Sequence, residues 1–211
     1  MRIVSWFALL LLAGRMTLAQ SSAPAAGSAH PADSLPRDQH EGMTISADSY
    51  SDPNRAREKF GKADPLPVGI LPVEVFLINA TTQAIRIDVD SVQLEVHFEN
   101  GDHQEIDWLP AGEVARKIAH PNGAENPHAP RIPIGVETGG DAKTDKLLEI
   151  LRPFALDASV VPPMATLHGF LFFDLNHNLP LAEHASLYVP NVTNVPEKKS
   201  LMFFEVVLGK T

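Results

Sequence analysis

Two histidines and two glutamates of this chain can meet across a β-hairpin. Residues 92–98 alternate apolar and polar side chains, which is typical of a strand with one buried face. A loop at 99–101 keeps the apolar side chains of the returning strand on that same face. The resulting polar cross-strand pairs are His97 with His103 and Glu95 with Glu105. Cross-strand Cβ atoms stand about 4.5–5.5 Å apart, so these imidazole and carboxylate groups are candidate ligands for one divalent ion such as zinc or copper.

The length of this loop follows from which residues must share a face. A two-residue loop of Asn100 and Gly101 would put Ile106 among the polar side chains, whereas a three-residue loop pairs Ile106 with Leu94. The three-residue loop also gives Gly101 a left-handed conformation, which glycine adopts without strain. The alternative to a metal site is a solvated outer face on which the two glutamates slightly weaken the hairpin.

A second group of possible oxygen ligands occupies alternate positions of one turn: Asp174, Asn176 and Asn178. An EF-hand loop also requires glycine at its sixth position and glutamate at its twelfth, where this chain has Leu179 and Ala185. A turn held by asparagine side chains is therefore the alternative interpretation. Three histidines surround the same turn: His168, His177 and His184. A histidine within an apolar strand is more often a packing residue than a ligand.

The sequence contains none of the common hydrolase or nucleotide-binding motifs. G-x-S-x-G, S-x-x-K and H-E-x-x-H are absent, and Gly139-Gly140 is not followed by a Lys-Ser/Thr pair. There is no cysteine, which excludes thiol chemistry and disulfides. With 17 Lys and Arg against 26 Asp and Glu, the net charge of −9 has the wrong sign for binding phosphate backbones. We therefore expect no catalytic residue, no cofactor and no nucleic-acid partner.

The N-terminus has the pattern of a secretory signal peptide at residues 1–19. Arg2 precedes an apolar run at 3–13, and Thr17-Leu18-Ala19 offers a small-x-small cleavage site. The run is shorter than the roughly 20 apolar residues that cross a bilayer, so we expect no membrane span. The alternative is an N-terminal core helix. The signal peptide predicts an exported protein, either periplasmic or secreted.

Residues 20–40 are predicted to be a flexible linker, and 41–211 one folded body. The linker is rich in Ser, Ala, Pro and Gly and has few large apolar residues to offset the entropy of ordering. The body begins with an alternating strand at 43–47. Asp52-Pro53 then predicts the capped start of a short helix that ends at Gly61.

The rest of the body alternates strand and turn signals around one long insertion. The expected strands after the helix are 68–79, 85–87, 92–98, one through Ile106 and Trp108, 166–173, 185–189 and 200–208. The insertion, at about 110–160, is rich in proline and glycine, and only residues 147–154 show helical spacing, after a cap at Asp141 or Thr144. Asn79 and Asn191 fit the N-glycosylation pattern, but we interpret both as turn residues.

Aromatic pairs in the last strands raise a separate question. Alternation points at least one ring away from the core in the stretches Phe170–Phe173 and Phe203–Phe204. Such rings are either a surface for a partner or are covered by the insertion.

Seven or eight mostly antiparallel strands favour an all-β fold, an immunoglobulin-like antiparallel β-sandwich with a helix-bearing insertion. The strand sequences Ile70–Val75, Asn79–Thr81, 92–98 and Gly169–Phe173 resemble exported bacterial immunoglobulin-like domains of uncharacterised families, including the telokin-like ones. The resemblance covers about half of the chain after the signal peptide. It implies the sandwich fold and an envelope setting, and it carries over no catalytic residue.

These observations predict a non-catalytic exported binding or scaffolding module of the bacterial envelope or the extracellular space. Its partner would be another envelope or extracellular protein, docked at a sheet edge or at the insertion. Two alternatives remain open. One is a metal-binding or metal-carrier protein that uses the histidine-bearing hairpin, and the other is a secreted hydrolase whose site the known motifs do not reveal.

Overall fold

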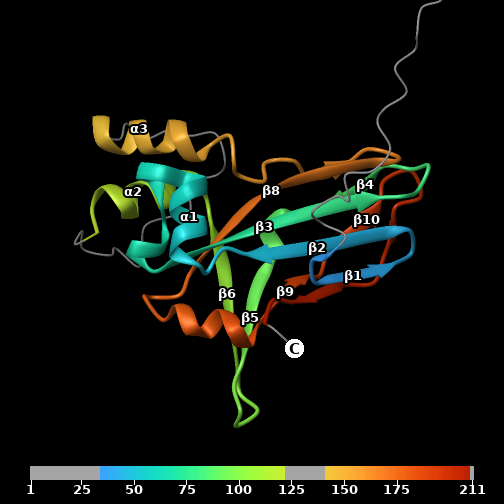
Figure 1. Ribbon diagram of the computed structural model, residues 1–211. Coiled ribbons are helices and arrows are strands. Elements are labelled where there is room, and N and C mark those ends of the chain that lie inside the picture. Colours follow the sequence, from blue (N-terminus) through green and yellow to red (C-terminus); the bar gives the residue numbers. More distant parts are fainter. Residues whose placement is uncertain (1–33, 122–140, 210–211) are drawn as a thin grey trace, which may run out of the picture. The chain divides into compact units, whose positions relative to one another are not determined.

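The protein is described here by a computed structural model of residues 34–121 and 141–209 (Figure 1). The expected signal peptide at 1–19, most of the expected linker and part of the expected insertion lie outside the described residues. The described residues belong to one folded unit. They consist mostly of antiparallel β-strands with few helices, as the alternating sequence patterns predict.

Eight strands form one antiparallel sheet in the order β1-β2-β3-β8-β6-β5-β9-β12. They are β1 (Arg37–His40), β2 (Met43–Ser49), β3 (Ile70–Asn79), β8 (Ala165–Asp174), β6 (His103–Leu109), β5 (Gln93–His97), β9 (Ala185–Val189) and β12 (Phe204–Val207). Strand β6 joins the two halves of the sheet, because it pairs with β5 over most of its length and with β8 at Trp108 and Leu109.

Four short strands form a second antiparallel sheet in the order β11-β10-β4-β7. They are β11 (Lys199–Ser200), β10 (Val192–Asn194), β4 (Ile85–Ile87) and β7 (Val160–Val161). The side chain of Asn79 ties the end of β3 to this sheet: its amide donates to the carbonyl oxygens of Gln83, Val161 and Pro162. Its Oδ1 accepts from the backbone N–H and hydroxyl of Thr81. Asn79 is the last residue of β3, and its side chain bonds the backbone of the turn that follows, as the sequence predicts.

Much of the core lies on the inner face of the eight-stranded sheet, which curves until its edge strands approach each other. Alternate side chains from all parts of the sheet are fully buried, among them Ile45, Val75, Leu94, Phe173, Leu187 and Phe204. The ring of His40 in β1 stacks on the ring of Phe204 in β12, with centroids 3.8 Å apart. The sheet is therefore nearly closed into a barrel, an arrangement that leaves little free edge.

Helices cover part of the outer face of β3 and β8 (Figure 1). Helix α1 (Pro53–Phe60) begins as the sequence predicts, with the Asp52 carboxylate accepting from the N–H groups of Asn54 and Arg55. Phe60 of α1 and Phe154 contact the ring of Phe170 edge-on. Because Phe154 belongs to the expected insertion, the insertion does cover part of the aromatic stretch in β8.

In the described part of the expected insertion there are two helices, of which the sequence indicates one. Helix α3 (Ala142–Leu151) is capped by Asp141, as predicted. Helix α2 (Ala111–Ala119) was not expected, because Pro110 and Gly112 suggest a break. Pro110 in fact precedes the first helical residue, where proline does not interrupt hydrogen bonding, and Val114 and Ala115 supply a buried face.

The hairpin between β5 and β6 has the predicted register and the predicted turn. Leu94 pairs with Ile106, and Phe98 closes the loop by donating its N–H to the carbonyl oxygen of Asp102. The three loop residues are 99–101, and Gly101 has a φ of +87°. The parity argument is therefore confirmed.

Two expected boundaries are wrong. The linker was expected to extend to residue 40, but Arg37–His40 form β1. This polar strand is held by its contacts with β2 and β12, and it buries no apolar face. The last strand was expected to be continuous over 200–208, but it divides into β11 and β12. The residues between them bond elsewhere: the Leu201 N–H donates to Val192 and the Met202 N–H to Glu41.

Within the described residues, no helix has the length and apolar character needed to cross a membrane.

Candidate functional site

The outer surface of β5, β9 and β12 brings together side chains from distant parts of the chain. In β5 the alternate residues Leu94 and Val96 are fully buried, so Glu95 and His97 point outward. In β12 Phe204 is buried in the same way, and Glu205 points outward. Strand β9 lies between these two strands, so their outward side chains share one surface.

Glu95, His97 and Glu205 converge on this surface, and we call them the outer-face triad. The Nε2 atom of His97 lies 3.9 Å from Oε2 of Glu95 and 3.9 Å from Oε1 of Glu205. One donor atom from each of the three side chains lies within 4.8 Å of the others. Among the described residues, the outer-face triad is the group of three metal-ligating side chains whose donor atoms lie close enough to share one ion.

The structure divides the four ligands predicted from sequence between two places. His97 does lie opposite His103, and Glu95 opposite Glu105, as the hairpin register requires. However, His103 contacts Glu105 of its own strand, with Nε2 3.8 Å from Oε1. Both of these side chains are more than half exposed. His97 and Glu95 instead meet a third residue, Glu205, that the sequence analysis did not select.

In the other predicted ligand groups, the side chains of Asp174 and His168 have structural partners. One Asp174 carboxylate oxygen accepts from the Asn176 N–H, and the other bonds Lys117 of α2. Asn176 and His177 both have positive φ, so this segment is the tight turn that was the alternative to a calcium loop. His168 stacks on Phe76, with ring centroids 5.5 Å apart. Its Nδ1 lies 3.5 Å from a carboxylate oxygen of Glu74.

Glu74 is a buried carboxylate with partners from three separate segments of the chain. The Tyr50 hydroxyl donates to Oε2 at 2.9 Å, and Nζ of Lys59 in α1 lies 3.6 Å from Oε1. Burial, together with the bond to this carboxylate, raises the pKa of Tyr50 to about 12. Lys59 also lies over the ring of Phe170. The cluster holds α1 against the sheet and neutralises a charge that burial would otherwise penalise.

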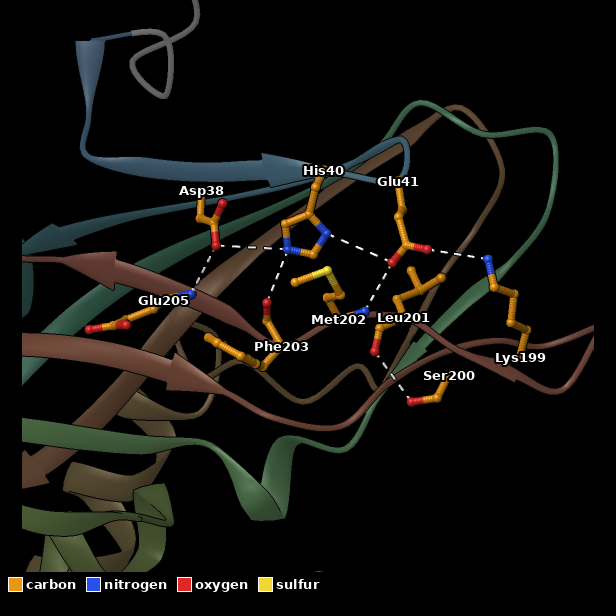
Figure 2. Close-up of polar contacts among 9 residues, drawn as sticks. All are labelled: Asp38, His40, Glu41, Lys199, Ser200, Leu201, Met202, Phe203 and Glu205. Carbon is orange, nitrogen blue, oxygen red and sulfur yellow. Dashed lines mark hydrogen bonds and ion pairs between the residues drawn. The ribbon is translucent and has the colours of Figure 1, made fainter.

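The two edge strands of the large sheet meet through side chains, and we call this contact the β1–β12 seam (Figure 2). The Asp38 carboxylate accepts from the Glu205 N–H at 3.1 Å, and Glu41 accepts from the Met202 N–H at 2.9 Å. His40 lies between the two carboxylates and donates from Nε2 to the Phe203 carbonyl oxygen at 3.0 Å. The pKa of Glu41 is lowered chiefly by its bond from Met202 and then by Lys199.

Exposed apolar side chains gather beside the seam. Met202, Phe203 and Val207 are 63%, 47% and 52% exposed, and the Phe203 ring contacts that of Tyr188 at 5.5 Å between centroids. We call Tyr188, Phe203 and Val207, together with the exposed Met202 that precedes Phe203 in the chain, the apolar patch. Glu205 of the outer-face triad lies in the same strand segment. Of the aromatic stretches that raised two interpretations, the rings of β8 are thus covered and Phe203 is not.

Comparison of the chain with protein-family models, with curated proteins and with solved structures gives no match. The proposals that follow therefore depend on the contacts described above.

Proposed function

We propose that the chain is a non-catalytic, exported β-domain that binds another envelope or extracellular protein through the apolar patch. The observation that carries this proposal is the concentration of exposed apolar side chains at one edge strand. Among the described residues, three of the seven large hydrophobic side chains that are exposed lie between positions 202 and 207. Apolar side chains that gather on a surface in this way commonly mark a site of protein contact.

The surroundings of the patch suit a protein partner. Tyr188 and Phe203 provide aromatic surface at little cost in conformational entropy, and aromatic residues are enriched at interfaces. Glu205 stands between Phe203 and Val207 on the outward face of β12, and the Asp38 and Glu41 carboxylates belong to the neighbouring seam. Interfaces commonly combine apolar side chains with polar groups of this kind.

The setting and the family assignment are parts of the same proposal. The N-terminal signal peptide pattern supports export to the periplasm or the exterior. The immunoglobulin-like assignment is supported by two groups of antiparallel strands, β1-β2-β3-β8 and β5-β9-β12, whose apolar faces line a common core. Strand β6, which pairs into both groups, is the point at which this chain differs from two separate sheets.

Site-specific photocrosslinking tests the proposal. A photoreactive amino acid placed at position 203 or 207 of the full chain, in cells that naturally produce it, should capture one identified exported protein. The matched control is position 150 on α3, where Ile150 is 38% exposed but lies outside the patch. We expect at least tenfold more capture from 203 and 207 than from 150, and loss of capture from 203 when Val207→Lys is added. Equal capture from all three positions would overturn the proposal.

A second candidate function, metal binding, is favoured by the contacts of the outer-face triad. It is argued from those contacts in the next subsection.

A further inference from the structure

We propose that Glu95, His97 and Glu205 form a binding site for a divalent transition-metal ion of the zinc class. This inference does not depend on the protein partner proposed above. It differs from the four-residue hairpin site expected from sequence, because it takes one ligand from β12 and leaves out His103 and Glu105.

The three donor atoms are close to the spacing that such an ion needs. In a tetrahedral zinc site with metal–ligand bonds of about 2.0–2.2 Å, neighbouring donor atoms are roughly 3.4 Å apart. His97 Nε2 is 3.9 Å from each carboxylate, and all three donors lie within 4.8 Å of one another. Small side-chain rotations would therefore bring them to bonding distance without movement of the strands.

The charges at the triad favour a cation. Most carboxylates with ion pairs elsewhere in the described residues meet a lysine or arginine, as Asp48 meets Arg55 and Asp174 meets Lys117. Within that part of the chain, the one basic side chain in ion-pair range of Glu95 or Glu205 is His97. With a neutral imidazole the triad carries two negative charges, which a divalent ion would neutralise.

The ligand types select the class of metal. Calcium and magnesium prefer sites made of oxygen atoms, whereas an imidazole nitrogen combined with carboxylates suits zinc and its neighbours in the transition series. His97 and Glu205 are 51% and 41% exposed, so a fourth coordination position would face solvent. Water, or a ligand from another molecule, can occupy that position.

The β1–β12 seam holds the third ligand in place. The backbone N–H of Glu205 donates to Asp38, and the carbonyl oxygen of Phe203, two residues earlier, accepts from His40. Figure 2 shows the Glu205 side chain directed away from these seam contacts, which use its backbone and leave its carboxylate for His97. The sheet order therefore brings a residue of the last strand to the β5–β6 hairpin.

Zinc titration by calorimetry, on the full chain without added tags, tests the site. Because the chain has nine histidines, matched variants are essential. We expect His97→Ala and Glu205→Gln each to weaken zinc affinity by at least tenfold, and His103→Ala to change it less than twofold. Calcium should not compete with zinc.

A structural effect is separated from a ligand effect by two further measurements. Without metal, the wild-type chain and the three variants should melt at the same temperature, because the substituted side chains are exposed or lie on the outer face. Cobalt bound in place of zinc should give a visible absorption spectrum that His97→Ala changes and His103→Ala does not. Failure of the wild-type chain to bind zinc, or equal loss in His97→Ala and His103→Ala, would overturn the proposal.

Discussion

Glu74 shows how a single buried charge is accommodated on the helix-covered side of the sheet. Its carboxylate is 7% exposed, and it accepts a hydrogen bond from Tyr50 while Lys59 and His168 lie within ion-pair range. Removing one partner of a buried charge usually costs more than the bond contributes, because the charge is left without compensation. The Tyr50 hydroxyl is the partner that can be removed without disturbing packing.

We predict that Tyr50→Phe lowers the free energy of unfolding by about 1.5–3 kcal/mol, the usual range for a hydrogen bond to a charged group. Urea denaturation measures the change. Tyr188→Phe is the matched control: it lies on the outer surface of β9, has no hydroxyl hydrogen bond within the described residues, and should change stability by less than about 0.5 kcal/mol. Equal effects of the two substitutions would contradict the role given to the Tyr50–Glu74 bond.

The burial of Tyr50, together with the same bond, has a consequence at high pH. The pKa of Tyr50 is about 12 in the folded protein, against 10.0 ordinarily, so the folded state holds the neutral phenol. The unfolded chain loses this proton more readily, and stability should therefore fall as the pH rises from about 10 toward 12. In Tyr50→Phe this part of the fall should disappear.

The β5–β6 hairpin is an element whose conformation depends on one residue. Gly101 has a φ of +87°, and a Cβ atom added there would meet no neighbouring atom. Any cost of Gly101→Ala therefore comes from backbone strain alone, and we predict a loss of about 1–2 kcal/mol in the free energy of unfolding. Gly112→Ala is the control, since the space there is also open but the residue is in α2 at ordinary φ. It should cause no loss, and chemical denaturation of both variants gives the comparison.

Elements with local signals were the ones that the sequence predicted well. The Asp52 and Asp141 caps, the strand alternation and the hairpin turn all depend on residues within a few positions of one another. Strand β1 has no apolar face, and its partners are the neighbouring β2 and, more than 160 residues away, β12. Such an element cannot be recognised from its own composition.

The residues of the candidate site also differ in whether local sequence predicts them. Glu95 and His97 were identified because both lie in one hairpin, where parity fixes which side chains share a face. Glu205 is also at an outward position by parity, since it alternates with the buried Phe204. The order of the strands in the sheet, in which β9 lies between β5 and β12, is not visible in the sequence. Long-range strand pairing therefore decided the third ligand.

At the scale of the whole molecule, the β1–β12 seam closes the large sheet without a backbone ladder between its edge strands. Unpaired edges invite pairing with other chains, and proteins commonly protect them. Here the protection comes from Asp38, His40 and Glu41, whose side chains bond the backbone of residues 202–205. Glu41 and Gly42 both have positive φ, so a tight two-residue turn after β1 directs the Glu41 side chain to this place.

We predict that the seam loosens in acid. The folded pKa of Glu41 lies below its ordinary value of 4.5, chiefly because the charged carboxylate accepts from the Met202 N–H. A carboxyl group with a depressed folded pKa stabilises the protein above its unfolded pKa, and this contribution is lost as the pH falls from about 4.5 through the lower folded value. The hydrogen-exchange protection factor of the Met202 amide should fall across that window.

A neutral variant separates titration of Glu41 from general unfolding in acid. In Glu41→Gln the side-chain amide oxygen still accepts from Met202 but carries no charge, so protection of that amide should be lower at neutral pH and should not change with acid in the same window. The amides of Asn54 and Arg55 provide an internal comparison, because Asp52, whose pKa is also lowered, caps them in both proteins. If protection at Met202 falls equally in the wild type and in Glu41→Gln, the acid sensitivity does not arise at Glu41, and the seam is not closed by this charge.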